Sequence, residues 1–200
     1  RYADVDPDIQ PELIRSKLIR KMIGHYDCLT GAEGDSEIYF VDPYGNFFFT
    51  LSDRFSRYEL NMMDYINEDA TDEQVRDWFD SDSYKEFCRI NKTVELPICR
   101  MIYVVPHRRG QGFQRKLIDE LKKVADEVGE GFCLFADPFV LEGQGREVNA
   151  REALVKMIQS DLVPPENYNY CLWKQRNAFL SYGLKNVKCN DPNFGCKEQD

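Results

Sequence analysis

The chain has 200 residues, of which 42% are hydrophobic and 13% aromatic, a composition typical of a globular protein rather than a disordered one. Its 26 Lys and Arg and 35 Asp and Glu give a net charge of −9, which disfavours nucleic acid and suits a cationic partner such as an amine. No apolar run approaches the roughly 20 residues that a membrane span needs, so we expect no membrane partner.

Cysteine and histidine are the side chains that would supply a zinc site, and the chain has seven and two of them, respectively. No two cysteines are separated by just two residues, and their number is odd. Neither zinc-site spacing nor a complete set of disulfides is therefore predicted. Reduced, mostly buried thiols are typical of a reducing compartment, so we expect a cytoplasmic protein without a metal.

Taken in chain order, the first periodic segment is 9–26, where apolar residues recur mostly at helical intervals and predict a helix. A loop is expected over 28–36, which contains two glycines. Residues 37–51 hold two runs rich in aromatic and β-branched side chains, separated by Asp-Pro-Tyr-Gly-Asn. This turn sequence predicts a β-hairpin.

The next segment, 54–92, is polar and acidic and predicts two or three helices, which would form an insertion in the domain. Within it, Thr71 and Gln74 stand at the spacing of a capping box, which indicates the start of a helix. A strand is predicted over 93–106, where Pro97 indicates a bulge or an edge position.

The clearest helix follows at 113–128. Its apolar residues recur every three or four positions and define one buried stripe, charged residues fill the opposite side, and Gly129 is a plausible end. Three later elements are predicted: a buried strand over 131–139, and helices over 149–160 and 171–184.

The turn between the strand and this helix contains Gly110 and Gly112, preceded by Arg108 and Arg109. The start of a helix has free backbone N–H groups and the positive end of the helix dipole. Glycines let those groups approach a ligand, and the arginines add positive charge. The turn therefore indicates a site for a phosphate or a diphosphate.

The residues around the glycines carry a more specific pattern. Val-Val-Pro at 104–106 and Arg-Gly-Gln-Gly-Phe-Gln at 109–114 resemble the cofactor motif of the GNAT superfamily of N-acetyltransferases. That family's motif is Arg/Gln-x-x-Gly-x-Gly/Ala, preceded by a strand ending in Val-x-Pro. The resemblance is specific from Cys99 to Val128, within a core motif over 94–130. Gln114 departs from it, since the family prefers Gly or Ala there.

The resemblance implies a single α/β domain over residues 1–200, with a mixed, mainly antiparallel, twisted sheet flanked by helices. It implies transfer of an acetyl group from acetyl-CoA to a primary amine of a small molecule or a protein. The backbone N–H groups that would hold the diphosphate of acetyl-CoA belong to Arg109, Gly110, Gln111, Gly112, Phe113 and Gln114. The strand edge that would pair with the pantetheine arm belongs to Ile102, Tyr103 and Val104.

Direct transfer to an amine needs a base for the amine and a proton for the leaving thiolate. The family often uses a glutamate on the strand before the glycine turn, so Glu95 is the first candidate base. Asp137, at the end of the next strand, is the second. The family's usual tyrosine position holds Phe179, so Tyr182 is the candidate acid. Alternatives for the acid are Ser181, Tyr168, Tyr170 and water.

Two other functions stay open. The missing tyrosine at position 179 favours a catalytically weak or inactive protein that keeps the fold and acts by binding CoA or a partner. The glycine turn taken alone also suits an enzyme that binds the phosphate of a nucleotide. The sequence indicates neither the acceptor nor the oligomeric state.

Overall fold

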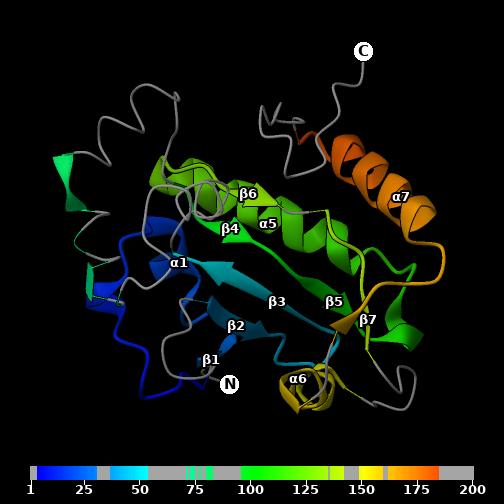
Figure 1. Cartoon of the computed structure of the whole chain (residues 1–200), viewed down its shortest axis with the longest axis horizontal. Coiled ribbons are helices and arrows are strands. Elements are labelled where there is room, and N and C mark those ends of the chain that lie inside the picture. Colours follow the sequence, from blue (N-terminus) through cyan, green and yellow to red (C-terminus); the bar gives the residue numbers. More distant parts are fainter. Residues whose placement is uncertain are drawn as a thin grey trace.

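The computed structural model describes residues 4–30, 37–53, 71, 73–74, 77, 80–82, 96–134, 136–141, 149–159 and 162–184. Within this part of the chain, a mixed, mostly antiparallel sheet is flanked by helices (Figure 1). The sheet therefore has the α/β character that the sequence predicts.

Six strands form this sheet: β1 (Asp27–Thr30), β2 (Glu37–Val41), β3 (Phe47–Ser52), β4 (Ile98–Cys99), β5 (Ile102–Val104) and β6 (Cys133–Leu134). Their order is β1-β2-β3-β4-β6, and β5 pairs with β3 beyond β4. All neighbouring strands are antiparallel except β4 and β6, which are parallel. The chain passes from β4 to β6 through β5 and one long helix, which together form the crossover.

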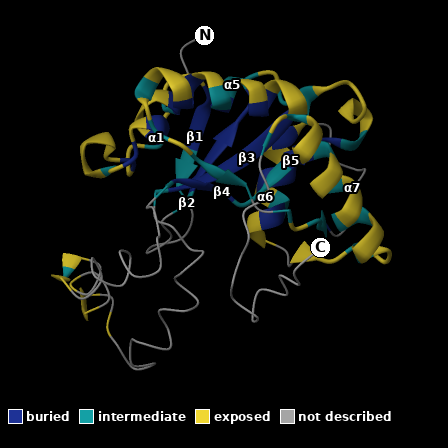
Figure 2. Cartoon of the chain, turned by 90° about the horizontal axis from the view of Figure 1, so that it is seen from above, coloured by how far each residue is buried: buried dark blue, intermediate teal, exposed yellow. Residues whose placement is uncertain are grey.

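The helices lie on both faces of the sheet. Those whose bounds lie within the described residues are α1 (Lys17–Met22), α5 (Phe113–Val128), α6 (Ala150–Gln159) and α7 (Tyr168–Ser181), with short 3-10 turns η1 (Pro11–Leu13) and η2 (Pro106–Arg108). Helices α1 and α5 pack together on one face, and α6 packs on the other (Figure 2). A separate two-stranded ladder joins β7 (Val140–Leu141) to β8 (Leu162–Val163).

Strand β3 separates two hydrophobic clusters, because its successive side chains point to opposite faces. Phe47, Phe49 and Leu51 pack with α1 and α5, whereas Phe48 packs with α6. Phe49 is fully buried, and its ring stacks on Phe40 with centroids 4.9 Å apart. The three consecutive phenylalanines therefore supply the core of both layers.

The predicted hairpin over 37–51 is confirmed as β2 and β3. In its turn, the Asp42 carboxylate accepts a hydrogen bond from Asn46 N at 3.0 Å. Gly45 has a φ of 76°, and a Cβ there would lie 2.9 Å from Cβ of Asn149. The turn therefore requires glycine both for its backbone conformation and for its contact with the start of α6.

The predicted helix over 9–26 is wrong for most of its length. Pro11 opens a 3-10 turn instead, and α1 begins only after Ser16, whose hydroxyl accepts a hydrogen bond from Ile19 N at 3.1 Å. Helix α1 ends before Gly24, which has a φ of 97°. The loop predicted over 28–36 is wrong for residues 28–30, which belong to β1. This strand forms by pairing with β2.

Later elements follow the predictions more closely. Helix α5 has the predicted bounds, and Gly129 caps it with a φ of 68°. The capping box is confirmed: Thr71 N donates to Gln74 Oε1 at 2.9 Å, and Gln74 N donates to Thr71 Oγ1 at 3.3 Å. Most of the insertion predicted over 54–92 lies outside the described residues. The strand predicted over 131–139 is regular only at β6, and α7 begins earlier than predicted.

Two cysteine thiols are expected to resist alkylation in the folded protein. Cys28 and Cys99 are each 1% exposed, and burial raises the pKa of each thiol to about 12. Since the thiolate is the reactive form, iodoacetamide at pH 8 should leave both unmodified while it labels the half-buried Cys171. Peptide mass spectrometry before and after unfolding measures this. Native labelling of Cys28 or Cys99 at the rate of Cys171 would contradict the packing.

Candidate functional site

Strand β5 pairs with β3 along one edge, and no strand in the described part of the chain pairs with its other edge. Val105 N donates a hydrogen bond to Asn46 O at 3.0 Å, so these two residues form a hydrogen-bonded pair of the ladder between β5 and β3. Bonded and non-bonded pairs alternate in an antiparallel ladder, so the peptide groups of Ile102 and Val104 point away from β3. Those of Tyr103 point toward β3. Two of the three predicted edge residues therefore present backbone groups to the open edge.

A β-bulge marks where the open edge begins. Ser52 faces Ile98 and Phe49 faces Ile102, so three steps along β3 correspond to four along the partner. The extra residue lies at 99–100, between β4 and β5. Strand β6 pairs with β4 but not with β5. The strands thus diverge at the bulge.

The glycine turn follows β5 through η2 and leads directly into α5. Gly110 and Gly112 have φ values of 75° and 83°, which other residues rarely adopt, and a Cβ on either would meet no atom within 4 Å. Gly112 is the N-cap of α5, and no side chain caps this helix. Its first residues, Phe113 and Gln114, are half-buried. The helix start is therefore open toward solvent, with backbone donors that no cap residue satisfies.

The charge around this helix start is positive, although the whole chain carries −9. The first turn of α5 has no acidic residue. Four exposed cationic residues surround it, Arg108, Arg109, Arg115 and Lys116, of which Arg115 also pairs with Asp119 at 3.9 Å. Together with the helix dipole, they favour an anion at this end of α5.

Arg109 links the turn to the strand edge. Its Nε donates to Val104 O at 3.0 Å, and its guanidinium carbon lies 5.3 Å from the centre of the Tyr103 ring. Gln111 Nε2 donates to His107 O at 3.2 Å and closes the turn. A ligand that pairs with the Val104 carbonyl therefore competes with the Arg109 side chain.

Of the two predicted catalytic residues, Glu95 lies outside the described residues. Tyr182 follows α7 and lies against α5: its carbonyl accepts a hydrogen bond from Lys122 Nζ at 3.0 Å, and the Arg115 guanidinium carbon lies 5.8 Å from its ring centre. Phe179, at the family's usual tyrosine position, is 7% exposed and belongs to the core. Tyr182 is thus placed near the basic start of α5.

The structure brings together two other candidates, Asp137 and Tyr168. The Tyr168 hydroxyl donates to Asp137 Oδ1 at 2.9 Å. Burial, and then this hydrogen bond, raise the pKa of Tyr168 above its usual value. The remaining acid candidates are engaged elsewhere: Ser181 Oγ donates to a carbonyl of its own helix, and Tyr170 stacks on Trp173 at the surface.

A polar cluster at the bulge was missed by the sequence analysis. The Glu37 side chain is only 16% exposed, and its Oε1 lies 3.7 Å from Arg100 Nε and 3.5 Å from Thr50 Oγ1. Arg100 belongs to the bulge, so Glu37 reaches it across β3. A charged residue in an otherwise apolar strand was the available signal. The cluster holds the Arg100 side chain against the sheet.

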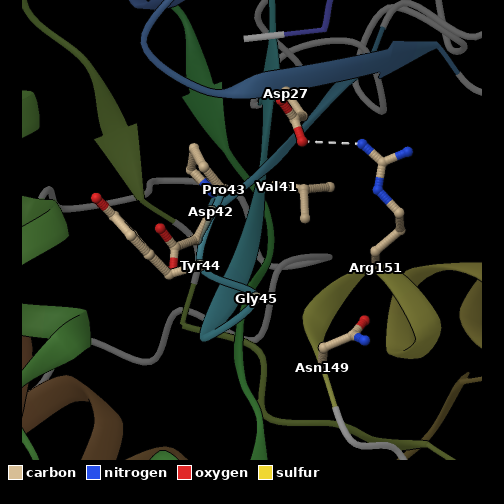
Figure 3. A pocket seen from close by; sticks show the side chains of 8 residues that line it. All are labelled: Asp27, Val41, Asp42, Pro43, Tyr44, Gly45, Asn149 and Arg151. Carbon is tan, nitrogen blue, oxygen red and sulfur yellow. Dashed lines mark hydrogen bonds and ion pairs between the residues drawn. The ribbon is translucent and has the colours of Figure 1, made fainter. Parts of the chain in front are cut away.

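A shallow pocket of about 260 Å³ lies between the hairpin turn and the start of α6 (Figure 3). Its buried Asp27 accepts a hydrogen bond from Arg151 at 2.9 Å, and Asn149 Oδ1 accepts one from Glu152 N at 2.9 Å. None of the predicted cofactor-binding residues lines it. Its polar groups join α6 to the sheet, and we assign it no ligand.

Comparison of the chain with models of protein families, with curated proteins and with solved structures finds no match. Among the described residues, no three His, Cys, Asp or Glu side chains are grouped so as to hold a metal ion. No helix within the described ranges is long and apolar enough to cross a membrane. The function therefore has to be inferred from the geometry around β5 and α5.

Proposed function

We propose that this chain is a GNAT-like N-acetyltransferase that moves an acetyl group from acetyl-CoA to a primary amine. The amine nitrogen attacks the thioester carbon, the carbon–sulfur bond breaks, and the sulfur takes a proton. The products are the acetylated amine and CoA, with net release of one proton from the ammonium form of the acceptor. Direct transfer needs no covalent enzyme intermediate, since holding the two reactants together supplies much of the rate.

One observation carries this proposal: an uncapped, basic helix start and an open strand edge are contiguous. The uncapped start of α5, with Gly112 as N-cap, follows β5 after a short basic turn. Acetyl-CoA has matching parts, because its diphosphate is joined to an extended arm that contains two amides. The diphosphate suits the helix N–H groups, and the arm suits the outward peptide groups of Ile102 and Val104.

The proton transfers are assigned to Glu95 and Tyr182. Glu95 is the proposed base for the amine, and Tyr182 is the proposed donor to the thiolate. The Arg115 guanidinium carbon lies 5.8 Å from the Tyr182 ring centre, which places this phenol beside the basic start of α5. The divergence of β5 and β6 at the bulge leaves the strand edge accessible to the thioester.

Calorimetry with purified protein tests the cofactor. We expect acetyl-CoA to bind, with ATP and NAD binding at least about tenfold more weakly because they lack an arm that can pair with β5. Release of free CoA thiol in the presence of primary amines then measures turnover. Tighter binding of ATP or NAD than of acetyl-CoA would contradict the proposal.

The alternative is a catalytically weak or inactive GNAT-like protein. It is favoured by Phe179, which is buried and has no proton to donate. On this alternative, acetyl-CoA binds, but no amine in the panel accelerates release of CoA. The same two measurements therefore separate the enzyme from the binding protein.

A further inference from the structure

The segment after β6 contacts the bulge at its start and β5 at its end. At its start, Leu134 pairs with Cys99 at the bulge. At its end, the Phe139 ring stacks on Tyr103, with centroids 6.1 Å apart and planes 27° apart. Asp137 lies between these two contacts. Its stretch of chain therefore starts at the bulge and ends beside Tyr103 of β5.

The Asp137 side chain is fixed from a second element. Tyr168, the first residue of α7, donates its hydroxyl to Asp137 Oδ1 at 2.9 Å. Asp137 is exposed and Tyr168 is half-buried, so the tyrosine anchors a carboxylate that still faces solvent. An ionised carboxylate accepts about four hydrogen bonds, and this contact leaves capacity for a cationic donor.

The protonation of the pair suits this arrangement. The raised pKa of Tyr168 keeps its hydroxyl a donor at neutral and moderately alkaline pH. Arg176, on the same helix, opposes part of that shift. The tyrosine thus serves as a neutral donor that orients the Asp137 side chain.

We propose that Asp137, positioned by Tyr168, binds the ammonium group of the acceptor amine before that group loses its proton. This inference rests on the proposed acetyl transfer, and it names the substrate class as a cationic primary amine. Ammonium offers three donors to the exposed carboxylate, and the contact brings the nitrogen to the edge along which the thioester arm lies. Tyr168 is a positioning residue, since it acts through Asp137.

Asp137→Asn tests the inference, because asparagine keeps the shape and the acceptor for Tyr168 but removes the charge. With n-butylamine as the acceptor, we expect KM for the amine to rise about tenfold. The calorimetric affinity for acetyl-CoA should stay unchanged. Wild-type KM for the amine should rise with ionic strength, and KM of the variant should not. Asp137→Glu keeps the charge and should restore part of the affinity for the amine.

Tyr168→Phe separates a positioning role from packing. We expect KM for the amine to rise about threefold, with little change in kcat. In the double variant with Asp137→Asn, the tyrosine substitution should add nothing further, since both act through one contact. Trp173→Phe is the control on the same helix. The Trp173 ring stacks on Tyr170 at the surface, and the kinetics of this variant should equal those of the wild type.

The outcomes distinguish this inference from the proposed function. If wild type acetylates amines and Asp137→Asn leaves KM for the amine unchanged, the inference is overturned and the proposed function stands. If Tyr168→Phe and Asp137→Asn have additive effects, the positioning role is overturned. If wild type does not bind acetyl-CoA, both the proposed function and the inference are overturned.

Discussion

Replacing Gly112 with aspartate is expected to weaken the binding of acetyl-CoA by about 100-fold or more. Gly112 has a φ of 83° and is the N-cap of α5. Aspartate is among the few residues that tolerate this conformation, so the helix should form as before. Its carboxylate would place a negative charge beside the N–H groups proposed for the diphosphate and would repel the anion. Losing two charge-assisted hydrogen bonds, at about 1.5–3 kcal/mol each, gives the stated magnitude.

Gly129→Asp is the matched control for this variant. Gly129 is the C-cap of the same helix, also has a left-handed backbone with a φ of 68°, and lies at the opposite end. The substitution adds the same charge and costs about 0.3–1 kcal/mol through the helix dipole. Calorimetry should show the wild-type affinity for acetyl-CoA. Equal affinities in the two variants would mean that the start of α5 does not hold the diphosphate.

Replacing Phe49 with alanine is expected to lower the free energy of unfolding by about 3–5 kcal/mol. Phe49 is fully buried between Phe40 and Tyr26, with ring centroids 4.9 Å and 5.1 Å from it, respectively. Alanine would leave a cavity between the sheet and the layer of α1 and α5. The midpoint of thermal unfolding, followed by circular dichroism, should fall by about 10 °C.

Tyr44→Ala provides the comparison for the core variant. Tyr44 also belongs to the hairpin region, but its side chain is 87% exposed at the turn. Its removal should change the free energy of unfolding by less than about 0.5 kcal/mol. The midpoint shift caused by a given loss of stability depends on chain length, and a loss of about 3–5 kcal/mol should lower the midpoint by more than about 2 °C here. A midpoint for Phe49→Ala within about 2 °C of the wild-type midpoint would therefore mean that the aromatic cluster does not stabilise the core.

The hairpin and α5 were predictable from sequence because local residues determine them. Gly45 suits a turn, Gly112 and Gly129 flank α5, and the apolar stripe between them has the helical period. Strand β1 was missed because its stability comes from pairing with β2 and from a bridge between Val5 and Cys28. Such pairing leaves little trace in the strand's own sequence.

Some residues of the candidate site could likewise be predicted from the sequence, and others could not. The glycine turn is contiguous in sequence, so its residues could be named. The Asp137–Tyr168 contact joins residues 31 positions apart, and no local pattern specifies it. Pro97 indicated a bulge or an edge, and the structure has a bulge shortly after it. The position of the extra residue depends on the pairing register with β3, which a single strand's sequence does not reveal.

The open edge of β5 also bears on self-association. An unpaired edge is a template onto which a neighbouring molecule can add a strand, and such additions lead to aggregates. Here the Arg109 guanidinium already occupies the Val104 carbonyl, and a cation at this position discourages a second backbone from docking. The side chain that a bound arm would have to displace is therefore the same one that would hinder the addition of a strand from another molecule.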